Sequence, residues 1–358
     1  MYYNNETCGP GELRCEVTRR QRQQLGNFFA RLSMRRYGWG LFLIWLSSAL
    51  AWSADYWPLP LVQLDPFFTH HILVAEKSTH LLHLFAYESD ERPPELIKSY
   101  PMATGKKAGD KIFQGDHRTP EGIYALTQFI DHQQLAQRYG RDGIIYGQGA
   151  FVLNYPNPID KAAGKSGGGI WIHSTNDETR IDKGLDSRGC VVISNKDLID
   201  LATFIELNKT MIVVVHDLHY VRTDTRQADQ QEIQNFLDSW LKAWNQLDLN
   251  NYLAAYDQHN FEDPVRGKFN AFKAYKQRVF RQSRDLQVAI TDVSLIRQEN
   301  YVVVTFRQHY RSATINDIGK KTLYLTRDDY YRWKIVAEIW QQFPDEEPGK
   351  FKASQRFF

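Results

Sequence analysis

Short runs of alternating apolar and polar residues dominate the chain between residues 70 and 216. The segment 71–85 (HILVAEKSTHLLHLF) contains two such runs around a Lys-Ser-Thr turn, so it predicts a β-hairpin. Pro120 and Gly122 fix a turn ahead of another strand. The further strands lie at 119–126, 150–155, 169–173 and 211–216. Helical spacing comes only after residue 190, where Ser194 and Asn195 can cap a helix over 196–207, so we predict a mostly β domain.

The pattern changes after about residue 220. The stretch 219–231 is mostly polar and charged, and it predicts a linker that runs into a helix. From Ile233 to Leu247 the apolar residues recur every three or four positions, which predicts an amphipathic helix. Alternating segments that predict antiparallel strands follow at 286–296, 301–312, 320–327 and 331–341. We therefore expect a second domain in which helices precede a curved sheet.

The N-terminal region has the features of an export signal. Residues 37–51 (YGWGLFLIWLSSALA) are uncharged and follow Arg35 and Arg36, but they fall short of the ~20 residues that span a bilayer. The small residues of Ala49-Leu50-Ala51 fit a signal peptidase site. A start at Met34 gives a compact signal peptide over 34–51, so we expect 1–33 to be a non-native upstream extension. The alternative is an uncleaved anchor, in which case a membrane is also a partner.

Charge separates this N-terminal region from the rest of the chain. The 358 residues carry a net charge of +2, but residues 1–36 alone contain seven Arg against three Glu. The remainder is nearly neutral and lacks the sustained basic field of nucleic-acid-binding proteins, so we expect no nucleic-acid partner. With 358 residues, the chain is long enough for two globular domains, and its 42% of hydrophobic residues is typical of folded proteins.

Cys190 is a candidate functional residue because no other cysteine would accompany it in the exported chain. The other cysteines, Cys8 and Cys15, precede Met34, so the exported chain would hold Cys190 alone. An unpaired cysteine in an oxidising compartment is a small buried hydrophobe, a partner for intermolecular pairing or a reactive thiol. His173 ends a predicted strand seventeen residues upstream and could serve as the base that a cysteine nucleophile needs.

A family resemblance favours the reactive thiol. The segments IHS (172–174) and SRGCVVIS (187–194) resemble the signature of the L,D-transpeptidase catalytic domain, the YkuD family: His-Gly or His-Ser, a variable loop, then Ser-(His/Arg)-Gly-Cys. The resemblance covers about residues 70–216 and includes the hairpin and the Thr-Pro-x-Gly turn. It implies a β-sandwich with the cysteine in a cleft under a lid. One departure is Val192, where many members have Arg or Asn.

Carried over residue by residue, the resemblance implies a cysteine acyltransferase that needs no metal and no other cofactor. Cys190 would be the nucleophile, His173 its base, and the Ser174 carbonyl would orient the imidazole. Backbone N–H groups of Gly189 and Cys190 would help form the oxyanion hole, and Ser187 and Arg188 would shape the cleft. The implied substrates are peptidoglycan stem peptides, from which the thiolate would displace the terminal D-residue of a tetrapeptide. An amine acceptor would then give a cross-link, whereas water would give a trimmed stem.

The second domain also resembles a known fold. Its helix followed by WKIVAEIWQQF (333–343) is similar to the nuclear-transport-factor-2-like (NTF2-like, SnoaL-like) cone, an α+β fold. The pairing with a YkuD domain resembles a subgroup of L,D-carboxypeptidases that affect cell shape. We expect this domain to be an accessory for binding, or for forming a homodimer.

The expected organisation, after the signal peptide, is as follows: an N-terminal lead segment (52–69), the catalytic domain (70–218), the linker (219–231), the NTF2-like domain (232–345) and a tail (346–358). We expect an L,D-transpeptidase of the periplasm or cell envelope. Two alternatives stay open: an L,D-carboxypeptidase that trims tetrapeptide stems to tripeptides, and a catalytically inert wall-binding module.

Overall fold

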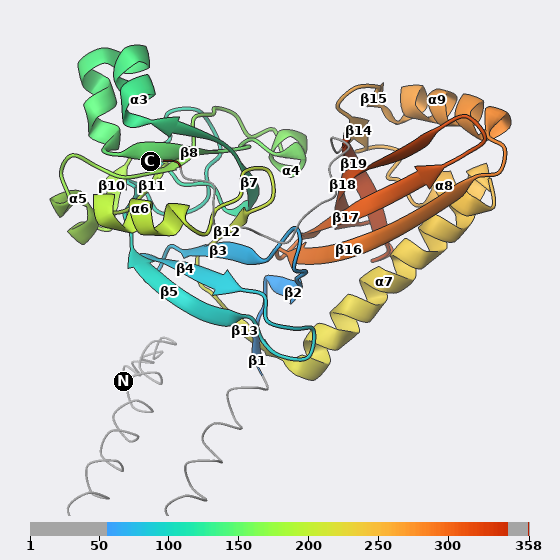
Figure 1. Cartoon of the computed structure of the whole chain (residues 1–358), viewed down its shortest axis with the longest axis horizontal. Coiled ribbons are helices and arrows are strands. Elements are labelled where there is room, and N and C mark those ends of the chain that lie inside the picture. Colours follow the sequence, from blue (N-terminus) through green and yellow to red (C-terminus); the bar gives the residue numbers. More distant parts are fainter. Residues whose placement is uncertain (1–55, 343–356, 358) are drawn as a thin grey trace, which may run out of the picture. The chain divides into compact units, whose positions relative to one another are not determined.

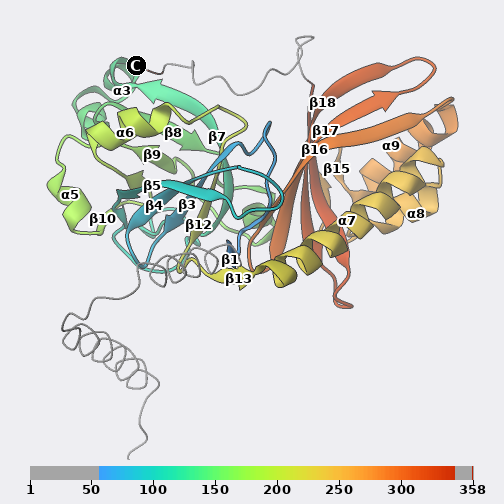
Figure 2. The same ribbon diagram turned by 60° about the horizontal axis from the view of Figure 1, so that its bottom comes forward.

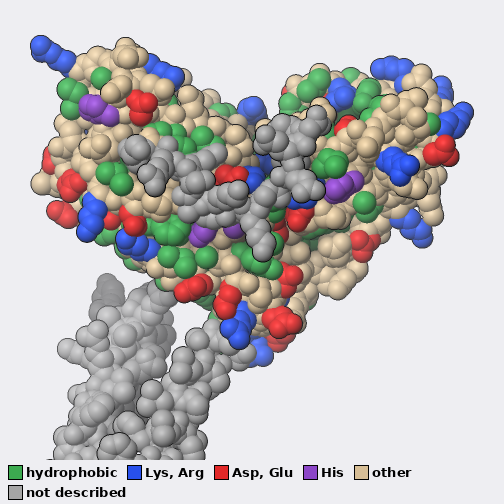
Figure 3. Space-filling view, in the orientation of Figure 1, with side chains coloured by type: hydrophobic (Ala, Val, Ile, Leu, Met, Phe, Trp, Pro, Cys, Tyr) green, Lys and Arg blue, Asp and Glu red, His purple; other side chains and the backbone are tan. Residues whose placement is uncertain are grey.

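The structure is a computed structural model in which residues 56–342 and Phe357 are described. The expected extension (1–33), the signal segment (34–51) and most of the tail lie outside these residues. The described residues belong to one compact unit, Ala54–Phe358. On the face shown in Figure 3, positively and negatively charged side chains are interspersed over this unit.

An eight-stranded sheet forms the first half of the unit (Figure 1). In spatial order its strands are β11 (Val191–Val192), β9 (Trp171–His173), β8 (Gly149–Leu153), β7 (Gly122–Asp131), β12 (Met211–Val215), β3 (His71–Glu76), β4 (Leu81–Ala86) and β5 (Glu95–Pro101). The pairs β11–β9 and β12–β3 are parallel, and the other neighbours are antiparallel. A short parallel pair, β6 (Thr104–Gly105) with β10 (Leu185–Ser187), accompanies the sheet. The mostly β fold and the hairpin at 71–85 are confirmed.

The helices of this half differ from the prediction. The predicted helix after Cys190 is present as α6 (Asn195–Ala202), capped by the Ser194 side chain. The expectation that helix comes only after residue 190 is wrong. Four short helical segments precede it: α3 (His132–Tyr139), the 3-10 helix η2 (Gly140–Tyr146), α4 (Pro158–Ala162) and α5 (Thr179–Asp182). Each spans at most about two turns, which is too short for a helical hydrophobic period to show in the sequence.

The second half is a five-stranded antiparallel sheet with helices on one side (Figures 1 and 2). The sheet order is β19 (Trp333–Gln342), β18 (Asn316–Arg327), β17 (Tyr301–Arg311), β16 (Gln287–Arg297) and β2 (Leu61–Gln63), and β14 (Glu262–Asp263) pairs with β15 (Gly267–Lys268). The helices are α7 (Thr223–Asn245), α8 (Leu249–Ala254) and α9 (Phe269–Gln282). Their apolar faces share one core with the sheet, so the predicted NTF2-like architecture is confirmed.

The segments at the boundary between the two halves form strands and a helix where the sequence predicts a lead segment and a linker. Residues 219–231 do not form a separate linker, because β13 (Tyr220–Arg222) pairs with β1 (Tyr56–Pro58) and α7 begins at Thr223. The lead segment supplies β2, which pairs with β16. The sequence predicts a linker here because most residues of this segment are polar. They are polar because only one stripe of the first turns of α7 is buried. Val74 of the first sheet and Val303 of the second lie in one hydrophobic core.

The chain also returns to the first half near its C-terminus. The ring of Phe357 lies 4.9 Å from that of Phe129 and 5.1 Å from that of Phe151, measured between centroids. Both partners belong to the core of the eight-stranded sheet or pack against it.

Candidate functional site

The parallel pairing of β9 with β11 brings His173 and Cys190 onto one face of the sheet. In this register Val191 lies opposite Ile172, and Val192 lies opposite His173. Because side chains alternate along a strand, Cys190, just ahead of β11, projects from the same face as His173. Tyr146, at the end of η2, has its ring 4.9 Å from the His173 ring, and it packs against the same hydrophobic cluster as Cys190.

The His173 imidazole has a fixed tautomer. Its Nδ1 lies 2.5 Å from the Ser174 carbonyl oxygen, and because a carbonyl only accepts, Nδ1 carries the proton and donates. Nε2 is therefore left as an unprotonated base. Burial lowers the pKa of His173 to about 4, and the nearby positive charge of Arg180 acts in the same direction, whereas the bond to Ser174 partly opposes them. The ring is neutral at pH 7.

Ser174 itself is held by the loop before β8. It is fully buried, and its Oγ accepts a hydrogen bond from Gln148 N at 2.7 Å and donates to the Tyr146 carbonyl at 3.3 Å. Gly147 makes this approach possible, because it has φ +59° and a Cβ there would lie 2.4 Å from Ser174 Oγ. The orientation of the imidazole thus depends on a turn 26 residues upstream of it in the chain.

The Cys190 thiol is partly exposed and rests in its protonated form. Its Sγ donates to the Gly169 carbonyl at 3.5 Å. Burial raises the pKa of Cys190 to about 11; a hydrogen bond from the Trp171 backbone and the charges of Arg180 and Lys111 act against this rise. At pH 7 the pair is therefore a neutral thiol beside a neutral imidazole, so the thiolate has to form by proton transfer as the thiol reacts.

The turn that presents Cys190 is closed by Ser187. The Ser187 hydroxyl donates to the Cys190 carbonyl at 2.6 Å and accepts the Gly189 N–H at 3.0 Å. Gly189 has φ +131°, and a Cβ there would lie 2.8 Å from the Arg118 carbonyl oxygen, so a side chain would clash. The Gly189 N–H, expected in the oxyanion hole, is engaged by Ser187 in this structure. The Arg188 side chain is exposed beside the turn.

Val192 occupies a core position. Its side chain is fully buried, and its backbone exchanges two 2.8 Å hydrogen bonds with Ala103. A polar group at this position, as in many members of the family that the motif resembles, would have to be buried too. Val192 therefore packs inside the protein, opposite His173 on the neighbouring strand, and its side chain offers no exposed surface to a ligand.

Arg180 acts electrostatically on the candidate site, and the sequence did not single it out. It lies on α5, and its Nε donates to Asp186 Oδ2 at 2.5 Å while Nη1 donates to Thr175 Oγ1 at 3.2 Å. Its charge reaches both members of the pair, because it lowers the pKa of His173 and of Cys190. Arg180 and Tyr146 were missed because they lie on the short helical segments α5 and η2, where a single arginine or tyrosine carries no recognisable spacing.

Two further features concern the described residues alone. Between residues 56 and 342 and at Phe357, no group of three or more His, Cys, Asp or Glu side chains is placed to hold a metal ion. Within the same residues, no helix has the length and apolarity needed to cross a bilayer. The segment 34–51, for which a signal peptide or an anchor is expected, lies outside this part of the chain.

Comparisons with known proteins identify both domains. Residues 70–215 match the model of the L,D-transpeptidase catalytic domain (YkuD), and residues 232–339 match that of the Cds6 C-terminal NTF2-like domain. The solved structure of Bd1075 from Bdellovibrio bacteriovorus is similar, with a TM-score of 0.68 and 28% identity over 82% of this chain and 100% of that one. The helical cell shape determining protein Pgp2 from Campylobacter jejuni gives 0.59 and 26% identity over 77% and 96%. No curated protein matches the chain significantly.

Proposed function

Since the chain carries an L,D-transpeptidase (YkuD) catalytic domain followed by a C-terminal NTF2-like domain, we propose that it processes peptidoglycan tetrapeptide stems through a Cys190 thioester. The observation that carries this proposal is the pairing at the sheet edge: Cys190 and His173 share a face, and the Ser174 carbonyl leaves only Nε2 of His173 free to take a proton. A neutral, oriented imidazole beside a protonated thiol is the arrangement that general-base activation of a nucleophile requires.

The first half-reaction forms the thioester. Nε2 of His173 takes the thiol proton while Sγ attacks the carbonyl carbon that precedes the terminal D-residue. The tetrahedral intermediate collapses when the C–N bond breaks, and the imidazolium returns the proton to the departing amine. The D-amino acid leaves, and the rest of the stem remains attached to Cys190.

Negative charge develops on the attacked carbonyl oxygen and needs donors. We propose that the backbone N–H of Cys190 supplies one of them. The N–H of Gly189 supplies a second only if it releases the Ser187 hydroxyl, which it engages at 3.0 Å. Arg180 lies near enough to stabilise the thiolate as it forms, since its charge lowers the pKa of Cys190.

The second half-reaction decides between the two enzymatic outcomes. Water attacking the thioester, with His173 again as base, releases a tripeptide stem; an amine from a neighbouring stem gives a cross-link instead. Family size alone favours transpeptidase. The two-domain arrangement favours trimming, because it resembles a subgroup of L,D-carboxypeptidases that affect cell shape and is shared along nearly the full length of the helical cell shape determining protein Pgp2. We therefore propose the L,D-carboxypeptidase outcome, acting in the cell envelope, where peptidoglycan lies.

The experiment is incubation of the purified full chain with tetrapeptide muropeptides, followed by mass spectrometry. Tripeptides support trimming, whereas dimers support transpeptidation and overturn the carboxypeptidase outcome. Cys190→Ala and Cys190→Ser should abolish either product while keeping the fold. If the native chain leaves tetrapeptides unchanged and forms no acyl adduct with a carbapenem, the inert wall-binding module is correct and the enzyme proposal fails.

A further inference from the structure

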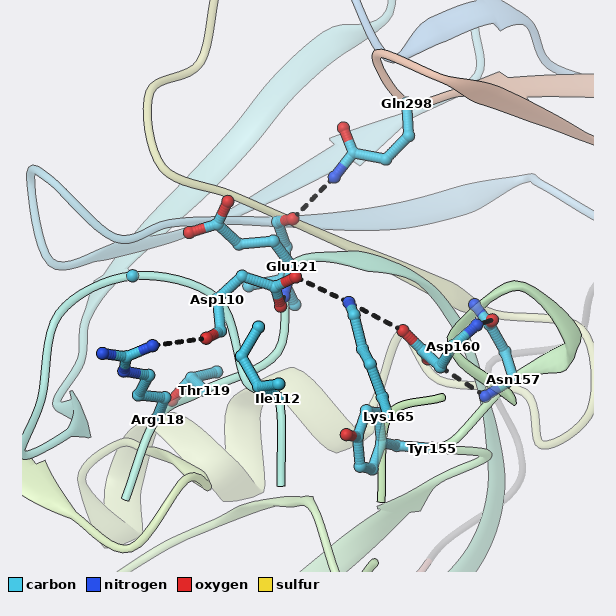
Figure 4. A network of polar contacts seen from close by, with 12 residues as sticks. Asp110, Ile112, Arg118, Thr119, Glu121, Tyr155, Asn157, Asp160, Lys165 and Gln298 are labelled. Atoms are coloured by element: carbon cyan, nitrogen blue, oxygen red, sulfur yellow. Dashed lines mark hydrogen bonds and ion pairs between the residues drawn. The ribbon is translucent and has the colours of Figure 1, made fainter. Parts of the chain in front are cut away.

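Two loops of the catalytic domain are joined by a network of polar contacts (Figure 4). We call them the cleft loops; they comprise residues 106–121 and 154–169. Both touch the turn that carries Cys190. The Gly169 carbonyl accepts the thiol hydrogen bond, and the Arg118 carbonyl lies directly against Gly189. The position of the nucleophile therefore depends on where these loops are held.

Lys165 ties the cleft loops together. Its Nζ lies 2.6 Å from Asp110 Oδ2 on one loop and 3.0 Å from Asp160 Oδ1 on its own loop (Figure 4). Asp160 is 2% exposed, so it depends on its partners for charge compensation. The backbone continues the link, because Ser166 N donates to the Ile112 carbonyl at 3.1 Å. These contacts hold the two cleft loops together as one wall.

The other end of this wall is fixed from the NTF2-like domain. Tyr301, the first residue of β17, is buried, and its hydroxyl accepts hydrogen bonds from Ile123 N at 2.7 Å and from Asn157 Nδ2 at 3.5 Å. The glycine of the Thr-Pro-x-Gly turn permits this approach, because a Cβ at Gly122 would lie 3.0 Å from the Tyr301 hydroxyl oxygen.

Asn157 passes this constraint into the second cleft loop. Its side chain accepts from Asp160 N at 2.9 Å, and its own N–H donates to Asp160 Oδ2 at 3.1 Å, which closes a capping box at the start of α4. Asp160 in turn holds Lys165. A continuous set of contacts therefore runs from Tyr301 through Asn157 and Asp160 to Lys165, which precedes Gly169 in the same loop.

From this set of contacts we infer that Tyr301 is a positioning residue for the nucleophile. By holding Ile123, whose carbonyl accepts from Asn157 Nδ2 at 3.0 Å, and Asn157 itself, it fixes the second cleft loop so that the Gly169 carbonyl engages the Cys190 thiol. The NTF2-like domain then contributes to catalysis from outside the cleft, in addition to any binding role. The inference rests on the proposed function for its turnover measurement, whereas the thiol measurement below does not need turnover.

The test is Tyr301→Phe in the full chain, which removes the hydroxyl and keeps the ring. We expect kcat and kcat/KM for tetrapeptide trimming to fall together by roughly tenfold to a hundredfold, as for a small displacement of the reacting group. We also expect alkylation of Cys190 by iodoacetamide to begin at lower pH. A carbonyl acceptor stabilises the neutral thiol, so a loosened Gly169 would favour the thiolate.

Two matched variants separate positioning from a general loss of stability. Gln298→Met removes another bond between the domains, from Gln298 Nε2 to the Val214 carbonyl at 2.9 Å, that does not involve the cleft loops. Tyr252→Phe removes a buried hydroxyl in the NTF2-like core, 2.7 Å from that of Tyr256. Both should leave the pH profile of Cys190 alkylation unchanged.

The outcomes are distinct. If Tyr301→Phe matches the native chain in both kcat and the alkylation profile, or if Gln298→Met shifts the profile equally, the positioning role is overturned. If the native chain does not process stems but Tyr301→Phe alone shifts the alkylation profile, the positioning role stands and the proposed function fails.

Discussion

The imidazole of His173 donates its Nδ1 proton to the carbonyl oxygen of the next residue, Ser174, across 2.5 Å. The bond is local in sequence, yet it requires Ser174 to be held from elsewhere, by Gln148 N and the Tyr146 carbonyl. In the proposed mechanism, a backbone carbonyl thus takes the orienting role that a carboxylate has in many catalytic triads. It orients the ring without adding a negative charge, which fits the neutral state that burial imposes on His173.

The resting state of the thiol predicts its reactivity towards alkylating agents. Because the pKa of Cys190 is raised to about 11, the thiolate fraction, and with it the alkylation rate, should rise about tenfold per pH unit from pH 7 towards pH 11. Peptide mapping by mass spectrometry after timed exposure to iodoacetamide distinguishes Cys190 from Cys8 and Cys15. A rate that levels off below pH 9 would show that the thiol already shares its proton with His173 in the resting protein.

Acid should destabilise the protein in part through His173. The unfolded chain takes up a proton near the ordinary histidine pKa of 6.5, whereas the folded side chain stays neutral down to about 4. As the pH falls through this window, the unfolded state binds more protons, and the free energy of unfolding drops by about 3 kcal/mol in total. Urea unfolding at pH 7 and pH 4 measures the drop.

His173→Gln should reduce this loss of stability between pH 7 and pH 4. His71, whose pKa burial also lowers to about 4, accounts for part of the remaining loss. The same variant should lower stem turnover by roughly 10²–10⁴-fold, because it removes the proposed general base. An unchanged acid sensitivity in His173→Gln would contradict the neutral, buried histidine.

A pair of glycines tests how the imidazole is oriented. Gly147 and Gly140 have nearly the same φ, +59° and +58°, but a Cβ at Gly147 meets Ser174 Oγ at 2.4 Å whereas one at Gly140 meets nothing within 4 Å. Gly140→Ala should cost only the backbone strain, roughly 1–3 kcal/mol. Gly147→Ala should cost a further roughly 1–3 kcal/mol from overpacking and should also reduce kcat, because Ser174 must move. Equal effects of the two substitutions would argue against control of His173 through Ser174.

Substitutions of Ser187 should affect the turn that carries Cys190. Ser187→Ala removes the hydroxyl that bridges Gly189 N and the Cys190 carbonyl and leaves two buried polar groups with one partner fewer. We expect a loss of about 1–3 kcal/mol in unfolding free energy and a fall in kcat of roughly tenfold or more. Ser187→Thr, which keeps the hydroxyl, should recover most of both. Higher activity in Ser187→Ala would instead mean that the Gly189 N–H is needed free.

The sequence alone determined what depends on local patterns. Alternating apolar residues specified most of the strands of both sheets, because side chains on a strand reach opposite faces in turn. Ser194 is a residue type that commonly caps helices, and it indicated the start of α6. In the structure its side chain accepts a hydrogen bond from Asp197 N. The order His173-Ser174, loop, Ser187-Arg188-Gly189-Cys190 was enough to select the candidate site.

Only the tertiary structure decided what depends on distant segments meeting. The contact between Tyr301 and Ile123 joins residues 178 positions apart, and neither residue carries a local signal of the other. Likewise β2 pairs with β16 of the second sheet, although β2 belongs to the lead segment that directly precedes the first domain in the chain. Hydrogen bonds and packing between distant segments are selected by the shape of the folded core, whereas periodicity and turn chemistry report only on neighbours in the chain. The setting of Cys190, and with it the neutral state of its thiol, comes from that core.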